Sequence, residues 1–115
     1  MRMIYISHPY TGDEVQNKNK ARLTAAVLAK EYPEIVFLNP LDAMHHAVTA
    51  NLDYDTIIRQ TIEILRRCNS IIMAGSWRES RGCMLEFKTA QETGMRIYDG
   101  IEDFRRNCRP EKGAE

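Results

Sequence analysis

The stretch from Asn69 to Gly94, NSIIMAGSWRESRGCMLEFKTAQETG, contains a strand, a polar loop and a helix in succession. Ser70 to Ala74 form a short, mainly apolar run, which is typical of a parallel strand that is covered on both faces. Ser80 can cap the helix that follows, because its side-chain oxygen can accept from backbone N–H groups two or three residues later. Gly94 is a residue type that commonly ends helices. This succession is the building unit of an α/β protein.

The helix in this stretch carries one carboxylate at an unusual position. At 3.6 residues per turn, Cys83, Phe87 and Ala90 share a face, and Glu86 borders that face one turn after Gly82. Gly82 has no side chain, so a ligand can approach the backbone of the first turn. The oriented N–H groups there favour the ionised form of a nearby carboxylate. We therefore expect Glu86 to be an ionised side chain at the rim of the core.

The same patterns predict the remaining elements of the chain. Strands are expected at 3–7, 34–38, 70–74 and 95–98, and helices at 15–31, 53–67, from Ser80 to Gly94, and 101–107, with a short helix and loop at 41–51. This order favours a flavodoxin-like three-layer sandwich with a parallel sheet of four to five strands. The loops 7–12, 39–40 and 75–82 then meet at the carboxyl ends of the strands, where ligands bind in such sheets.

Length and charge limit the classes of partner. The 115 residues support a single domain, expected at 1–108, followed by a charged tail at 109–115 that is expected to be disordered. The 16 Lys and Arg residues are balanced by 16 Asp and Glu residues. This balance argues against polymeric nucleic acid or an anionic membrane as a partner, and it favours a small ligand or a protein.

Cysteine and histidine spacing predicts no metal site, and no cofactor is expected. The chain has three cysteines without C-x-x-C spacing, which argues against a disulfide framework or a zinc site; we expect Cys68 and Cys83 in the core. The adjacent His45 and His46 would project about 100° apart on a helix and are expected at the surface. No apolar run is long enough to span a membrane, and the N-terminus lacks a signal-peptide layout, so a cytoplasmic protein is expected.

Three loops carry a resemblance to the nucleoside 2-deoxyribosyltransferase-like superfamily, which includes 2′-deoxynucleoside 5′-phosphate N-hydrolases. The match covers roughly residues 3–98, and its most specific part is an S-x-G-x-x-x-E pattern. The motifs are Tyr5 with Ile6-Ser7-His8-Pro9 and Thr11-Gly12, then Asn39-Pro40, then Gly75-Ser76-Trp77 leading to Ser80-Arg81-Gly82 with Glu86 four residues on.

In enzymes that this chain resembles, the position of Glu86 holds the nucleophile and the position of Tyr5 helps to hold it. The resemblance thus implies that Glu86 and Tyr5 are catalytic. It also implies a nucleoside or nucleotide substrate and a homodimer or higher homo-oligomer that completes the site. The expected substrate-binding residues belong to the three loops and are Ser7, His8, Pro9, Thr11, Gly12, Asn39, Trp77, Ser80 and Gly82.

Cleavage of an N-glycosidic bond suits these residues chemically. It passes through an oxocarbenium-like state that a carboxylate can stabilise, or trap as a glycosyl ester. The Tyr5 hydroxyl would orient Glu86, while Ser80 and the N–H groups around Gly82 would receive a 5′-phosphate. Trp77 would either lie against a base or cover the end of the sheet.

Two positions depart from the family pattern. Family enzymes usually have an aspartate, which protonates the departing base, where this chain has Thr61. Threonine cannot be that acid, and the alternative is an ordinary hydroxyl bonded to its own helix. His8 replaces a small glycine, so it either narrows the pocket or supplies a titratable group that could take over the acid's role.

The sequence therefore leaves three functions open. The first is a glycosidase or deoxyribosyltransferase that acts through Glu86. The second is a nucleotide-binding module that has lost turnover, acting as a sensor or a sequestering protein, and Thr61 is the residue that supports it. The third is cleavage of the nicotinamide-ribose bond of a dinucleotide, which expects a larger cleft than 115 residues readily enclose.

Overall fold

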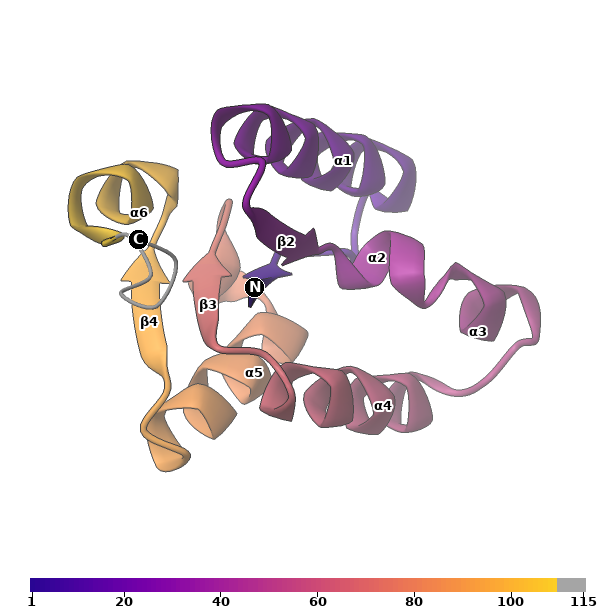
Figure 1. Ribbon diagram of the computed structural model, residues 1–115. Helices are drawn as coiled ribbons and strands as arrows, with labels where there is room; N and C mark the ends of the chain where they lie inside the picture. Colours follow the sequence, from indigo (N-terminus) through magenta and orange to yellow (C-terminus); the bar gives the residue numbers. More distant parts are fainter. Residues whose placement is uncertain (110–115) are drawn as a thin grey trace.

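Four parallel strands in the order β2-β1-β3-β4 form the sheet of the computed structural model, which describes residues 1–109 (Figure 1). The strands are β1 (Arg2–Ser7), β2 (Ile35–Leu38), β3 (Ser70–Met73) and β4 (Arg96–Asp99). The helices are α1 (Glu14–Glu31), α2 (Pro40–Ala43), α3 (His45–Thr49), α4 (Tyr54–Arg66), the 3-10 helix η1 (Trp77–Glu79), α5 (Arg81–Glu92) and α6 (Ile101–Asn107). The predicted flavodoxin-like three-layer sandwich is confirmed, with four strands.

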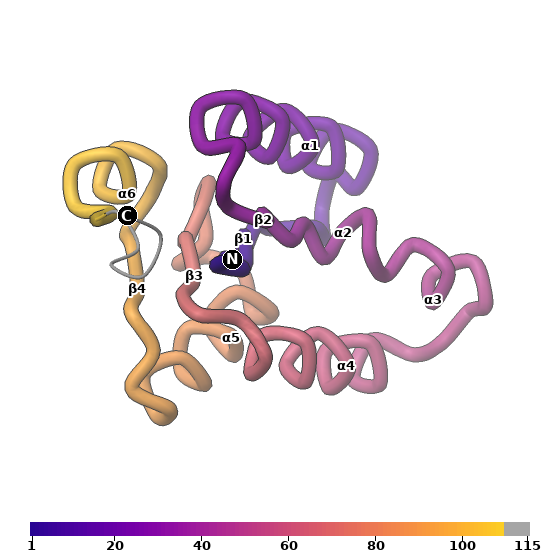
Figure 2. The backbone as a smooth tube through the Cα atoms, viewed as in Figure 1, coloured from indigo at the N-terminus to yellow at the C-terminus, as the bar shows by residue number. Residues whose placement is uncertain are grey.

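The helices cover both faces of the sheet. Figure 1 shows α1 and α6 on one side and α4 and α5 on the other. The tube in Figure 2 follows β1 between its two neighbours, β2 and β3. Tyr5 pairs with Leu38 of β2 and with Ile71 of β3, so β1 is an interior strand. Within residues 1–109, no helix is both long and apolar enough to cross the bilayer.

Polar side chains start the helices that follow the strands. Asp13, Asp53 and Ser80 each accept a hydrogen bond from a backbone N–H three residues later, at the starts of α1, α4 and α5. These side chains satisfy N–H groups that have no partner inside the helix. The cap at Ser80 confirms the one predicted from the sequence.

The segment after β2 differs from its prediction. A short helix and loop were expected at 41–51, whereas two short helices form, α2 and α3. Helix α2 begins at Pro40 because Asn39 caps it, accepting from the Leu41 N–H at 3.2 Å, and because proline is favoured at the first helical position. The tail expected at 109–115 lies, apart from Arg109, outside the described residues.

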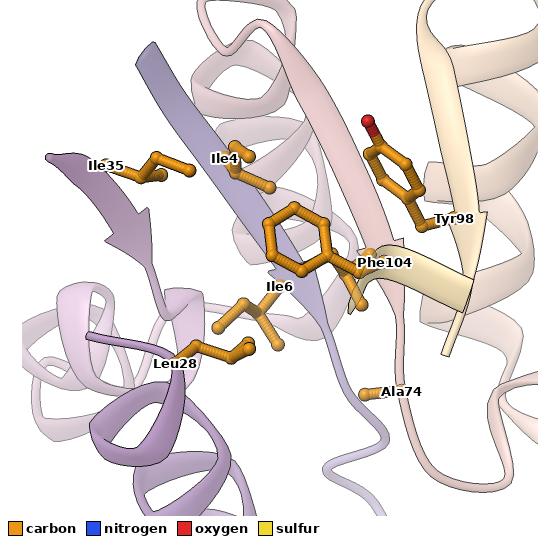
Figure 3. Packing of buried hydrophobic residues seen from close by; sticks show 8 residues of the cluster. Ile4, Ile6, Leu28, Ile35, Ala74, Tyr98 and Phe104 are labelled. Carbon is orange, nitrogen blue, oxygen red and sulfur yellow. The ribbon is translucent and has the colours of Figure 1, made fainter. Parts of the chain in front are cut away.

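A hydrophobic cluster lies on each face of the sheet. Phe104 of α6 lies at the centre of the first cluster, which Figure 3 shows, with its ring centroid 5.0 Å from that of Tyr32 and 5.1 Å from that of Tyr98. The second cluster lies between the sheet and helices α4 and α5. Its fully buried members include Leu65, Ile71 and Met73.

Strand β1 contributes to both clusters because successive side chains of a strand point to opposite faces. Ile4 and Ile6 belong to the first cluster, whereas Tyr5 belongs to the second. By the same alternation Ser7 faces the second side. The two hydroxyls of β1, those of Tyr5 and Ser7, are therefore directed toward α4 and α5.

Candidate active site

Glu86 of α5 receives both hydroxyls of β1. The Tyr5 hydroxyl donates to Oε2 of Glu86 at 2.5 Å, and the Ser7 hydroxyl donates to Oε1 at 2.6 Å. All three side chains are buried, with Tyr5 and Ser7 fully inaccessible and Glu86 5% exposed. The contact expected between Tyr5 and Glu86 is thus present, and a second donor accompanies it.

Glu86 lies deeper than the sequence predicted. It was expected at the rim of the core, but it shares the buried face of α5 with Cys83 and Ala90. Burial raises the pKa of Glu86 above its ordinary value, and the hydrogen bonds from Ser7 and Tyr5 oppose that rise. The prediction of an ionised form was based on the helix dipole, which falls off within the first turn. Glu86 lies beyond that turn, so removal from water has the larger effect on its pKa.

The groups next to Glu86 are held neutral. Burial raises the pKa of Tyr5 well above its ordinary value, and the charge of Glu86 adds to the rise, so Tyr5 stays a hydrogen-bond donor. Burial also raises the pKa of the Cys83 thiol. Thr61 is 6% exposed and its hydroxyl donates to the Ile58 carbonyl at 2.9 Å, which confirms the ordinary role predicted for it. The Thr61 hydroxyl also lowers the pKa of Glu86.

Two pockets meet at the carboxyl ends of the strands. The apolar pocket has a volume of about 100 Å³ and is bordered by Glu86, Thr61 and apolar side chains such as Met44 and Ile57. The polar pocket has a volume of about 570 Å³. It is bordered by Asn17, Lys20, Ser76, Glu79 and Arg81 among others. His8, Thr11, Tyr54 and Ser80 border both pockets.

Several of the expected substrate-binding residues border these pockets. His8, Thr11 and Ser80 border both, Pro9 borders the polar pocket and Gly82 the apolar one.

Other expected residues do not border either pocket. Ser7 is fully buried under Glu86, and Asn39 caps α2 and donates to Asp42 at 3.3 Å. Gly12 lies in an exposed turn with φ at +109°. Ser7 and Asn39 use their side chains, and Gly12 its backbone N–H, for hydrogen bonds within the protein.

Trp77 packs against the protein, and of the two roles left open by the sequence, contact with a base or cover for the end of the sheet, the second is observed. It is 5% exposed, its ring centroid lies 4.9 Å from that of Phe87, and its N–H donates to Asp99 at 3.0 Å. Arg78 also donates to Asp99, at 2.9 Å, and its guanidinium lies over the Trp77 ring. Trp77 therefore ties the loop after β3 to the end of β4.

Gly82 provides space for a neighbouring side chain. A Cβ at this position would lie 2.9 Å from the Tyr54 hydroxyl and 3.1 Å from Cδ1 of Ile58. Tyr54 is 39% exposed and borders both pockets, and Arg81 lies over its ring while pairing with Asp55 at 3.2 Å. Sequence reasoning missed Tyr54, and the only signal for it was its place in the first turn of a helix at this edge.

His8 is held in a tight position. It is 9% exposed and its Nδ1 lies 2.8 Å from the Pro9 carbonyl oxygen. The ring lies against Gly75, where a Cβ would be 3.4 Å from Nε2. Gly75 has φ at +62°, a conformation that glycine adopts without strain.

The other two histidines are exposed, as expected, and His45 contacts the Lys18 ammonium at 2.7 Å. Among residues 1–109, no group of three or more potential metal ligands is found. Cys68 and Cys83 are buried and reduced, as predicted.

The parallel sheet and its helices make this an α/β protein. Its candidate ligand site lies at the carboxyl edge of the sheet, where Glu86 is buried and accepts two hydrogen bonds. The chain belongs to the family described as a domain of unknown function (DUF4406), whose model matches residues 2–99. No curated protein matches it.

Proposed function

We propose that the protein cleaves the N-glycosidic bond of a nucleoside or nucleotide, or transfers the deoxyribosyl group, with Glu86 acting on C1′. The single observation that supports this most is the Glu86 carboxylate, which both hydroxyls of β1 hold by hydrogen bonds at the border of the apolar pocket. A carboxylate fixed in this way can stabilise an oxocarbenium-like state or form a glycosyl ester with C1′.

The polar pocket supports a nucleotide rather than a bare nucleoside as the substrate. Lys20 and Arg81 supply positive charge there, and the start of α5 adds backbone N–H groups next to Ser80. Helix N-termini and cations together bind phosphate. Glu79 also borders this pocket, so the phosphate would bind nearer to the two cations.

The volume of the apolar pocket limits which part of a nucleotide can bind there. An apolar cavity of about 150 Å³ holds one benzene molecule, so a pocket of about 100 Å³ cannot hold a sugar and a base together. We propose that the sugar lies over Glu86 and that the base extends past the residues shared by both pockets. Tyr54, which is partly exposed, moves to widen this passage.

A panel of nucleosides, deoxynucleotides and NAD, with chromatography of the released base, tests the proposal. We expect release from one or more deoxynucleotides by the wild type and none by Glu86→Ala. The matched control is Glu92→Ala, because Glu92 is an exposed glutamate on the same helix. Release at wild-type rate by Glu86→Ala would refute Glu86 as the nucleophile, and release of nicotinamide from NAD would favour the dinucleotide function.

The alternative is a nucleotide-binding module without turnover. Two observations favour it, the threonine at position 61 and the raised pKa of Glu86, which reduces the carboxylate fraction at a given pH. Tight nucleotide binding by calorimetry, with no base released over hours, would be its signature. A cytoplasmic location and a homodimer or higher oligomer stay predictions; light scattering after size exclusion measures the second.

A further inference from the structure

We propose that His8 gives a proton to the departing base through Nε2 and later accepts one from the attacking water. This inference rests on the proposed glycosidic cleavage and assigns the general acid for it. A departing base that is not protonated leaves as an anion, and general acid catalysis of this kind is worth about 10² to 10⁴ in rate.

The hydrogen bond of Nδ1 fixes which nitrogen is available. A carbonyl oxygen only accepts, so Nδ1 carries a proton and donates it to the Pro9 carbonyl at 2.8 Å. Nε2 is then the atom that gains or loses a proton. Within residues 1–109, Nε2 has no hydrogen-bond partner, although the His8 side chain is only 9% exposed. Among the described residues, Nε of Arg2 is the only buried side-chain nitrogen or oxygen without a partner, so Nε2 of His8 keeps accessible surface at the pocket border, where a ligand can reach it.

The position of His8 suits the leaving group. His8 and Glu86 both border the apolar pocket, and His8 also borders the polar one. A sugar placed over Glu86 in a pocket of about 100 Å³ leaves its base at the residues that the two pockets share. His8 is one of the four side chains there, with Thr11, Tyr54 and Ser80.

The other titratable groups around His8 are less suited to this role. Lys20 and Arg81 border the polar pocket, where they are assigned to the phosphate, and Glu79 borders only that pocket. In the apolar pocket, burial raises the pKa of Cys83, and Glu86 is required as the nucleophile. The phenols of Tyr10 and Tyr54 complete the set. Among these side-chain types, imidazole is the one that exchanges a proton near neutral pH.

The proton and electron balance is complete without a cofactor. A carboxylate oxygen of Glu86 bonds to C1′ while the C1′–N bond breaks, and the electron pair of that bond stays on the base. Nε2–H of His8 protonates a ring nitrogen of the base, which leaves neutral. Water then attacks C1′ and gives a proton to Nε2, and the bond between C1′ and Glu86 breaks. One water is consumed, and both side chains return to their starting states.

The test compares two leaving groups on the same deoxyribose 5-phosphate. One substrate carries a natural base, and the other carries 4-nitrophenolate, which departs without protonation. We expect His8→Gln to lower kcat on the natural substrate by about 10² to 10⁴ and to change the 4-nitrophenyl substrate less than tenfold. Added imidazole should restore release of the natural base by His8→Ala. His46→Gln, at an exposed histidine, is the matched control and should change neither rate.

Each other outcome has a defined meaning. Equal losses on both substrates by a folded His8→Gln protein would overturn the assignment of His8 and leave the proposed function standing, provided that release still requires Glu86. A loss on both of these phosphorylated substrates that is absent with the corresponding nucleoside, which lacks the phosphate, would show that His8 binds phosphate instead. If the wild type releases neither leaving group, the proposed function fails and the role of His8 fails with it. Far-UV circular dichroism and thermal melting confirm that each variant is folded.

Discussion

The Tyr5 hydroxyl donates to the Glu86 carboxylate at 2.5 Å although 81 positions separate the two residues in the chain. Ser7, the next residue of β1 on the same face, donates to the other oxygen of the same carboxylate. The orientation of Glu86 is therefore set by a strand at the other end of the chain as well as by its own helix. Each carboxylate oxygen retains a further lone pair that can face a substrate.

Removal of either hydroxyl should change both stability and the ionisation of Glu86. Both hydrogen bonds lower the pKa of Glu86, so Tyr5→Phe and Ser7→Ala should each raise it and move the acidic limb of the pH–rate profile to higher pH. Each should also cost about 1 to 3 kcal/mol of unfolding free energy, because a buried acceptor loses a donor. Urea denaturation and pH-dependent base release measure the two effects.

The control for this pair is Tyr32→Phe, which removes a tyrosine hydroxyl far from Glu86, beside Phe104. It should leave the pH–rate profile unchanged. An acidic limb at the same pH in all three variants would show that neither hydroxyl controls the ionisation of Glu86.

Glu86→Gln should gain stability relative to the wild type as the pH rises. Burial raises the pKa of Glu86 in the folded state, so the folded state binds more protons than the unfolded state between the two pKa values. The stability contributed by Glu86 is thus complete below the unfolded pKa, about 4.3, and is lost as the pH rises through the folded pKa. The variant has no such proton to lose.

Thermal melting of wild type and Glu86→Gln from pH 4 to pH 8 measures this difference. The difference in melting temperature between Glu92→Gln and the wild type should be nearly constant across this pH range, because Glu92 is exposed. If instead the melting temperature of the wild type rose relative to that of Glu86→Gln as the pH increases, hydrogen bonding, and not burial, would control the pKa of Glu86.

Gly82→Ala should destabilise the domain through Tyr54. The new Cβ would lie 2.9 Å from the Tyr54 hydroxyl and 3.1 Å from Cδ1 of Ile58. Because the exposed Tyr54 side chain can shift, the cost should lie at the lower end of the range of about 1 to 3 kcal/mol for overpacking, partly offset by the helix propensity of alanine. Adding Tyr54→Phe removes the hydroxyl and should recover part of the loss. A double-mutant cycle by urea denaturation tests this, and additive effects would show that Tyr54 and the added methyl group do not collide.

Thr61→Asp should destabilise the protein more at pH 8 than at pH 5. The position is 6% exposed beside Glu86, and two carboxyl groups in one buried site cannot both ionise without a large cost. We expect a loss of about a few kcal/mol at pH 8. Thr61→Val keeps the shape of the side chain and adds no carboxyl, so its cost should vary with pH much less than that of Thr61→Asp, through the loss of a hydroxyl that lowers the pKa of Glu86. An equal loss from Thr61→Asp at both pH values would show that the new carboxyl reaches solvent.

The fold could be predicted because its strands and helices have clear hydrophobic periodicity and residues that stop or cap them. Ile71 and Ile72 lie in an uninterrupted apolar run, and Ser80 caps α5 as its residue type predicts. Helices α2 and α3 were less predictable, because elements of four and five residues are too short to show a helical period. The start of α2 depends on Asn39 and Pro40, which indicated only the end of a strand.

The site was predictable in part. Glu86 and Tyr5 were expected together through a resemblance, and the structure brings them into contact. The depth of Glu86 depends on how α4 and α5 pack on the sheet, which the period of α5 alone does not reveal. The same holds for Lys20, Tyr54 and Arg81, whose proximity arises from three separate helices.

The interior position of β1 has a consequence for biosynthesis. β1 lies between β2 and β3, and its side chains belong to the cores on both faces of the sheet. A nascent chain that ends before Ser70 has no partner for the second edge of β1, and it lacks the helix that carries Glu86. We therefore expect that a chain truncated before Ser70 does not fold on its own. The domain should acquire its native structure in a single cooperative step after β3 and α5 have been translated.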